Sequence, residues 1–431
     1  MIRFVGLLAL LIGGCLQDMV GAQSISDDRE HVTQWLAPET SSWVNSADRF
    51  RLQNRFRVPG EFEPHEYLLM AVSGDHVHSK TIARIIREIG GSIQPIVLAG
   101  DAFDRHQLLQ DLDEYGVDTD EVTILCIEHD SKWCRDFGPT SLVNRQEVRL
   151  LDWTYSDDRK LDDDVSVQLA AISQTRVQFT PLSFEGGNLL SNGNGLVITS
   201  EKLFFQNLDH GALQTADELK KQLGADQLLV LEPLIGEGTA HVDMFATFTS
   251  PTTIVVGSYD PEVDPDNAGI LDRNAQALSK VLTRHGRLNV VRIPMGSREG
   301  DCWRTYTNCI FANGVLVIPT YGDYDDSEVM KQVLDTYREL LPGWKVTTVD
   351  SQSLIGDGGA LRCASLGISR LNIELESTPD SEFPAVRTDL ASPQLERSDE
   401  VEEIDNWDFV DQGLIIHALG RHYFLNQRNP R

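Results

Sequence analysis

Short apolar runs alternate with amphipathic stretches along most of the chain, in the repeating order strand, helix, strand. The apolar runs are bounded by Gly, Asp or Asn, as is typical of buried strands, and the stretches between them have helical periodicity. Strands are predicted at 67–70, 92–98, 122–127, 148–151, 177–181, 195–199, 228–231, 253–257, 290–293, 315–319 and 346–349, and helices at 81–89, 165–173, 215–223, 274–285 and 329–341, with a further helix before residue 122.

This alternation predicts an α/β protein. The unit recurs at a period of roughly 50 to 60 residues, which favours radial or stacked repeats over one open sheet. A doubly wound sheet is the alternative, because its loops also gather at strand ends. In either arrangement the loops that leave the same end of each unit are expected to meet in one cleft.

The N-terminus is predicted to be a secretory signal over residues 1–22. A basic start, Met1-Ile2-Arg3, precedes the apolar run 4–12, which is too short to span a bilayer. Two processing sites compete: the run ending at Cys15 resembles a bacterial lipobox, and residues 20–22 have the small-residue pattern of ordinary cleavage. The protein is therefore expected to be exported, with a lipid on Cys15 as its only tie to a membrane.

Composition divides the remaining chain into four parts. Residues 23–47 form an N-terminal segment, and residues 48–373 are predicted to be the catalytic domain. Residues 374–405 are acidic, contain proline and have few large apolar residues, which predicts a flexible segment. Residues 406–431 are apolar enough to dock as a short helix.

The net charge of −29 argues against nucleic acid as a partner and would attract a cationic substrate. An acidic surface also serves solubility, so the charge by itself does not identify a ligand. The chain has no paired CxxC spacing, no P-loop and no dinucleotide fingerprint, and neither a metal nor an organic cofactor is expected. The sequence does not specify the oligomeric state.

Five glycine-punctuated loops, each after a predicted strand, carry the candidate chemistry. Together they supply two aspartates, a histidine, an asparagine and a cysteine. Such a set suits one task, in which carboxylates hold a planar cation while a thiolate attacks its central carbon. The loops are residues 133–139, 185–188, 241–243, 304–308 and 358–363.

Cys363 is the candidate nucleophile, because it follows Gly358-Gly359 on a loop where a backbone can approach closely. A small buried hydrophobe is the alternative interpretation of this cysteine. Without Cys15 the chain has five cysteines, so at least one has no partner within the chain, and Cys363 is expected to be that one. Two pairings stay open, Cys126 with Cys134 and Cys302 with Cys309.

His241 and Asp243 lie two residues apart, so on a strand they would share a face, where an imidazole beside a carboxylate can carry protons. A structural histidine is the alternative. Asp136 is expected in a turn closed by Gly138-Pro139, where it could also cap the turn.

The reaction that these groups predict is hydrolysis of a guanidino group. Aspartates bind the planar guanidinium through charge-assisted hydrogen bonds, and Cys363 adds to its carbon. His241 protonates the departing ammonia and then activates the water that hydrolyses the covalent thiouronium.

Five motifs, WCRDFGP, FEGGN, GTAHVDMF, RTYTN and GGALRC, resemble the agmatine deiminase and bacterial-type peptidylarginine deiminase family over about residues 48–367. The resemblance implies the pentein fold, a five-bladed pseudosymmetric α/β propeller with the site on its axis. It also implies the following roles: Cys363 as nucleophile, His241 as acid and base, Asp136 and Asp243 as guanidinium clamps, Asn308 completing the pocket, Trp133 against the arm of the substrate, and Glu185 orienting the histidine or the substrate.

One residue departs from the family pattern. Members usually have His immediately before the cysteine, whereas this chain has Arg362. Such a cation could lower the pKa of the cysteine or repel a guanidinium.

Agmatine and an arginine residue of a peptide are both candidate substrates. Export and the run before Cys363 favour the peptide, and the frequent small-molecule role of the family favours agmatine, which we place slightly ahead. An amidinotransferase and an inactive exported protein that binds guanidino compounds are the alternative functions.

Overall fold

The computed structural model describes residues 55–73, 76–156, 158–300 and 302–384. The predicted signal at 1–22 with its Cys15, the segment 23–47 and the docking segment 406–431 lie outside these residues, so they stay predictions. None of the helices within the described ranges has the length and apolar character needed to cross a membrane.

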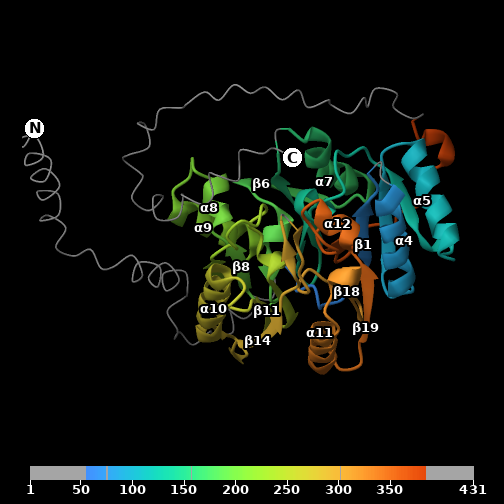
Figure 1. Cartoon of the computed structure of the whole chain (residues 1–431). Helices are drawn as coiled ribbons and strands as arrows, with labels where there is room; N and C mark the ends of the chain where they lie inside the picture. Colours follow the sequence, from blue (N-terminus) through green and yellow to red (C-terminus); the bar gives the residue numbers. More distant parts are fainter. Residues whose placement is uncertain (1–54, 74–75, 157, 301, 385–431) are drawn as a thin grey trace, which may run out of the picture. The chain divides into compact units, whose positions relative to one another are not determined.

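Five sheets of three or four strands make up the mixed α/β fold (Figure 1). Four of them have the same topology, in which a short strand pairs antiparallel with a central strand and a crossover helix leads to a third, parallel strand. The first of the four consists of β4 (Thr140–Val143), β5 (Val148–Thr154) and β6 (Arg176–Ser183), with α7 (Lys160–Ile172), and the second of β7 (Leu190–Ser191), β8 (Leu196–Ser200) and β9 (Gln227–Leu231), with α8 (Lys202–Gln206) and α9 (Ala212–Leu223). The third consists of β10 (Ala246–Ser250), β11 (Thr253–Ser258) and β14 (Asn289–Pro294), with α10 (Pro265–Lys280). The fourth consists of β17 (Ile310–Ala312), β18 (Val315–Thr320) and β19 (Lys345–Asp350), with α11 (Ser327–Leu340).

The fifth sheet joins distant parts of the chain. Its order is β20 (Leu366–Ile368), β1 (Tyr67–Ala71), β2 (Gln94–Ala99) and β3 (Thr123–Cys126), with α4 (His76–Ile89) and α5 (Ala102–Glu114) in the connections. The last of these strands in sequence, β20, pairs antiparallel with the first, β1. The nucleophile loop therefore runs directly into a strand that the start of the domain holds in place.

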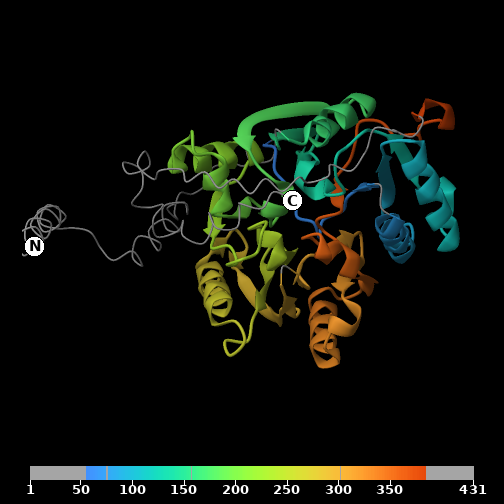
Figure 2. The same ribbon diagram turned by 45° about the horizontal axis from the view of Figure 1, so that its top comes forward.

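The strands lie inside and the helices outside. Figures 1 and 2 show α4, α10 and α11 at the periphery of the described domain, with the strands between them. All five residues of β1 and of β8 are buried, as expected for strands covered on both faces. Apolar side chains form three buried clusters, the largest of which includes Cys363 itself.

Prediction of the central strands and their helices is confirmed, with two kinds of error. The first strands of the four repeats and β20 were missed, because runs of two to five residues give little periodicity. The helix predicted at 274–285 is α10, which begins earlier because Asp264 caps it and Pro265 is compatible with its first turn. It ends at Lys280, and a hairpin of β12 (Leu282–Thr283) and β13 (Gly286–Arg287) follows.

The first part of the acidic segment packs on the domain. Thr378 donates its backbone N–H to Ile124, and the hydroxyls of Ser377 and Thr378 accept from the edge strand β3. Phe383 is buried against the cluster around α4 and α5. The prediction of a flexible segment over residues 374–405 is therefore wrong for its described part, 374–384, and residues 385–405 lie outside the described ranges.

Asn313 offers a test of how the last repeat is attached to the first. It has φ of +46° in the two-residue Asn-Gly turn between β17 and β18, and its side chain bonds to both the N–H and the C=O of His65 and to the C=O of Ser92. We expect Asn313→Ala to lower the free energy of unfolding by about 2 kcal/mol, through lost hydrogen bonds and strain. Asn313→Gly relieves the strain and should cost about half as much. Urea denaturation measures both, and equal losses would show that the side-chain bonds alone matter.

Candidate active site

The five candidate loops meet, and direct hydrogen bonds join them. Gly187 N donates to Asp136 Oδ1 at 2.9 Å, and the hydroxyl of Thr307 donates to the backbone oxygen of Asp243 at 3.1 Å. The backbone N–H of Arg135 donates to the oxygen of Cys363 at 3.2 Å. Residues far apart in the sequence therefore form one continuous site, as the common position of the loops in each repeat predicts.

Cys363 lies at the centre of the site as a free thiol. Its sulfur is 3.2 Å from Asn308 Nδ2 and 3.9 Å from Asp243 Oδ2, and only 3% of the residue is exposed. Burial, together with the charges of Asp243 and Asp136, raises the pKa of the thiol well above its usual value. All five cysteines in the described part of the chain are unpaired, so neither of the disulfides left open is formed.

Asn308 positions the nucleophile from two sides. Its Oδ1 accepts from the backbone N–H groups of Arg362 at 2.9 Å and Cys363 at 3.2 Å, while its Nδ2 donates to the sulfur. The residue is fully buried. Because both ends of one amide are used, the loop and the thiol are held in a single orientation.

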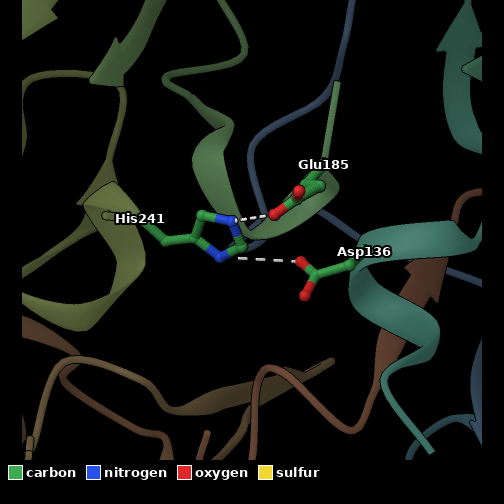
Figure 3. Close-up of side chains that lie close together, drawn as sticks. All are labelled: Asp136, Glu185 and His241. Carbon is green, nitrogen blue, oxygen red and sulfur yellow. Dashed lines mark hydrogen bonds and ion pairs between the residues drawn. The ribbon is translucent and has the colours of Figure 1, made fainter. Parts of the chain in front are cut away.

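His241 lies between two carboxylates (Figure 3). Its Nε2 is 2.5 Å from Glu185 Oε2, and its Nδ1 is 3.7 Å from Asp136 Oδ1. Burial and the charge of Lys202 act to lower the pKa of the imidazole, but Asp136 and Glu185 outweigh them and raise it. Burial raises the pKa of Asp136 to about 6, in spite of the opposing effect of His241.

One local prediction is wrong. His241 and Asp243 do not share a strand face, because η3 (Val242–Met244) is a single 3-10 turn that sends His241 towards Glu185 and Asp243 towards Cys363. The turn predicted at Asp136 is the one-turn helix α6 (Cys134–Phe137), which ends at Gly138, whose N–H donates to Cys134 O. A Cβ at Gly187 would lie 2.6 Å from Asp136 Oδ1 and collide with His241, so the approach of these side chains requires glycine there.

Trp133 immediately precedes α6 and covers the nucleophile loop. A Cβ at Gly359 would lie 2.6 Å from its ring, which shows how closely the indole is packed on that loop. Lys132 places its ammonium 5.3 Å from the centre of the ring and pairs with Asp357. The indole is only partly buried, so it can also face a ligand.

Lys202 and Gln206 belong to the site and were missed by sequence reasoning. Lys202 Nζ is 2.5 Å from Glu185 Oε2 and 3.2 Å from His241 Nε2, while Gln206 donates to Glu185 Oε1 at 2.8 Å. Despite burial of Glu185, Lys202 and His241 hold the pKa of its carboxyl well below the usual range. Lys202 and Gln206 are four residues apart, which places both on one face of α8. This spacing is the only feature of the sequence that could have indicated them.

A metal ion fits poorly among these side chains. Donor atoms of Asp136, Glu185 and His241 lie within 4.8 Å of one another, which is a spacing that a cation could use. The ammonium of Lys202, however, already contacts Glu185 and His241. A second cation at this point would face strong repulsion.

Glu61 is the other residue that the sequence did not reveal. Its carboxylate accepts from Arg362 Nε at 3.0 Å and pairs with Arg135 Nη1 at 2.8 Å. Arg362 in turn donates from Nη1 to Asp243 Oδ2 at 2.6 Å. Burial acts to raise the pKa of Glu61, but the charges of Arg135 and Arg362 outweigh it and lower the pKa to about 2.

This network shows how the positive charge of Arg362, which stands where the family usually has His, is accommodated beside Cys363. Its guanidinium is 2% exposed and directed at Glu61, Asp243 and the backbone oxygen of Leu189, which neutralise its charge and satisfy its donors. The pKa of Cys363 is raised, not lowered, beside it. Arg362 is therefore a buried ion-pair partner of Asp243 in this structure, and the lowered thiol pKa that the sequence allowed is not found.

A mixed α/β fold that brings a thiol, an imidazole and aspartates to one point defines the class of guanidino-group deiminases. The chain belongs to the Porphyromonas-type peptidyl-arginine deiminase family, whose profile matches residues 57–368.

Known proteins of this class cover most of the chain. A Listeria monocytogenes protein classed as an agmatine deiminase is 24% identical over 374 residues, 76% of this chain and 100% of that protein. The structure of the agmatine deiminase of Enterococcus faecalis superposes with a TM-score of 0.65 at 21% identity, covering 75% of this chain and 98% of that one. The agmatine deiminase of C. jejuni gives 0.61 at 22% identity, covering 73% and 96%. At these identities the structures establish the common fold.

The buried network predicts a large effect on stability. We expect Arg362→Met to lower the free energy of unfolding by about 3–5 kcal/mol, because it leaves Asp243 buried without its cation. Adding Asp243→Asn should recover part of the loss, since the unpaired charge is then removed. Arg338→Met, which breaks an exposed pair with Asp335, is the control and should cost less than about 1 kcal/mol. Equal losses at the buried and exposed arginines in denaturant titrations would contradict this assignment.

Proposed function

We propose that the protein is a guanidino-group iminohydrolase, which converts a guanidino compound and water to the ureido product and ammonia. One observation carries the proposal: His241 Nδ1 and Asp243 Oδ1 are buried and have no hydrogen-bond partner among the described residues. The Asp243 carboxylate lies 3.9 Å from the thiol of Cys363, and His241 Nδ1 lies 3.7 Å from Asp136. Buried polar atoms are rarely left unpaired. Asp243 Oδ1 can accept from a planar N–H donor, and protonated His241 Nδ1 can give a proton to a nitrogen of the reacting group. A guanidinium in this position would donate to the aspartates and present its carbon to the sulfur.

The first half of the reaction forms the covalent intermediate. Arrival of the cationic substrate favours loss of the proton from Cys363, whose pKa is otherwise raised. The thiolate adds to the guanidinium carbon and gives a neutral tetrahedral adduct. Protonated His241 gives its proton to one nitrogen, the C–N bond breaks, and ammonia leaves a cationic thiouronium on Cys363.

The second half hydrolyses that intermediate. His241, now neutral, removes a proton from water as the oxygen attacks the same carbon. The C–S bond then breaks, Cys363 leaves as a thiolate, the hydroxyl proton of the adduct passes to solvent, and the neutral ureido product is released. Asp136 and Asp243 hold the nitrogens of the reacting group through both halves, and Asn308 keeps the sulfur in line.

Agmatine is the substrate that we place first. The site is enclosed, because His241 and Cys363 are each at most 3% exposed, and this suits a thin, small substrate better than arginine within a folded chain. The net charge of −29 would attract a dication. The relatives classed as agmatine deiminases support the same choice. An arginine-ended peptide is the competing substrate, in keeping with the name of the family.

We also propose that the five sheets are the blades of a five-bladed pseudosymmetric α/β propeller. The shared topology of four sheets supports this, as does the pairing of β20 with β1, which joins the two ends of the domain. The site loops each leave a different sheet and are joined by hydrogen bonds, as expected for loops that meet on an axis.

An activity assay tests the reaction and its substrate together. We expect the mature protein to form a ureido product and ammonia from agmatine, and Cys363→Ala to lose at least ~10³-fold, because no other described thiol contacts both Asn308 and Asp243. Colorimetric detection with agmatine, free arginine and an arginine-ended peptide identifies the substrate. Transfer of the amidino group to glycine or ornithine would instead indicate an amidinotransferase. Thermal stabilisation by guanidino compounds without product would indicate a binding protein.

The pKa shifts predict a bell-shaped pH profile. Asp136, whose pKa burial raises to about 6, must be ionised to bind a cation, so kcat/KM should fall as the pH drops below about 6. His241, whose pKa is raised, must start protonated, so the rate should also fall on the alkaline side. The substrate keeps its charge throughout, since a guanidinium stays protonated at these pH values. A profile that is flat from pH 7 to pH 4 would rule out this role of Asp136.

A further inference from the structure

The ammonium of Lys202 is a charged group at the site to which the proposed reaction gives no role. It belongs to α8, whereas the groups that it contacts come from two other segments: Glu185 precedes η2 (Gly186–Asn188), and His241 precedes η3. The Lys202 side chain is 14% exposed, and among the described residues its ammonium contacts Glu185 and His241. A largely covered lysine between a carboxylate and an imidazole needs an explanation, because removing a charge from water is costly.

The contacts leave the two nitrogens of His241 in different surroundings. Nε2 faces Glu185 and Lys202, so it either donates to the carboxylate or accepts from the ammonium. Nδ1 faces Asp136, and it has no hydrogen-bond partner among the described residues. Protons can therefore be exchanged with a substrate at Nδ1 only.

Charge around the imidazole is balanced between opposing groups. Asp136 on α6 and Glu185 favour the imidazolium, while Asp243 on η3 is itself neutralised by Arg362. Lys202 is the cation that faces His241 and opposes them, at 3.2 Å from Nε2. Two adjacent cations repel each other strongly in a buried site, so Lys202 disfavours the protonated imidazole.

We propose that Lys202 is a positioning residue for the second half of the reaction, which holds Glu185 against His241 and keeps the imidazole from being reprotonated before it activates water. This inference rests on the proposed deiminase function. After ammonia has left, His241 is neutral and must stay so until water attacks the thiouronium. In the free enzyme Asp136 and Glu185 outweigh Lys202 at the imidazole, but in the intermediate the positive charge of the thiouronium is added to that of Lys202. Without Lys202 the two carboxylates would draw a proton back to His241 from solvent, and the intermediate would then persist on Cys363.

Lys202→Met separates the two half-reactions. With agmatine as substrate, we expect release of ammonia in the first turnover to stay within about twofold of the wild-type rate, while hydrolysis slows about tenfold at pH 7. The thiouronium adduct should accumulate on Cys363 and be visible by mass spectrometry of the intact protein. The deficit should disappear as the pH rises, because solvent then no longer protonates His241.

Two matched variants separate charge from position. Gln206→Leu removes the other hydrogen bond that holds Glu185 without changing any charge, so it should lower the rate equally at every pH and without an adduct. Lys202→Arg keeps the cation and should stay within about threefold of wild type. If Lys202→Met does not fold, Lys202→Gln supplies the neutral variant. A wild-type pH profile in the neutral variant, or one that matches that of Gln206→Leu, would overturn the proposal.

A second readout does not depend on turnover. The side-chain nitrogens of His241, followed by NMR across a pH titration, should deprotonate at a higher pH in Lys202→Met than in wild type or Gln206→Leu. An unchanged midpoint would overturn the role of Lys202 even in an active enzyme. Absence of turnover in the wild type, with the midpoint shifted as expected, would instead contradict the deiminase function and leave the electrostatic role of Lys202 in place.

Discussion

A chain of ion pairs, in which positive and negative side chains alternate next to the nucleophile loop, supports the whole site. Arg135, Glu61, Arg362 and Asp243 follow one another within hydrogen-bonding distance, and together they carry no net charge. Each charge would be costly to bury alone, so each depends on its neighbours. Arg135 also binds the backbone of the nucleophile loop through Cys363 O and Arg362 O. The same network therefore fixes the position of the Cys363 thiol and of one carboxylate oxygen of Asp243.

Two cations of the site, Arg362 and Lys202, each pair with a carboxylate close to the reacting groups. Arg362 pairs with one oxygen of Asp243 and leaves the other without a hydrogen-bond partner among the described residues, while Lys202 pairs with the oxygen of Glu185 that also contacts His241. Asp136 forms no ion pair with a lysine or arginine of the described residues and relies on Gly187 N and His241, which is why burial raises its pKa so far. The aspartate whose charge is least compensated is therefore well placed to gain most from a bound guanidinium.

The repeated topology explains how this arrangement is assembled. Each sheet delivers one loop from the same end, and the loops are then joined by side-chain and backbone hydrogen bonds that cross between repeats. The glycines at 187 and 359 permit the approaches of His241 and Trp133 that any side chain would prevent. Catalytic geometry in this fold thus depends on contacts between repeats more than on any single motif.

The sequence by itself determined the α/β class, the central strands and the loops that carry the reactive residues, because periodicity and glycine-bounded motifs are local properties. Cys363, His241, Asp136, Asp243 and Asn308 were found in this way, and Glu185 and Trp133 through the resemblance to the family. The structure brings all seven together. Only the tertiary structure decided how they are paired. Glu61 lies 301 residues from Arg362, and Lys202 lies 39 from His241, so no spacing rule could connect them. The direction of each side chain at the site, including the separation of His241 from Asp243, was likewise set by turns that only the assembled fold imposes.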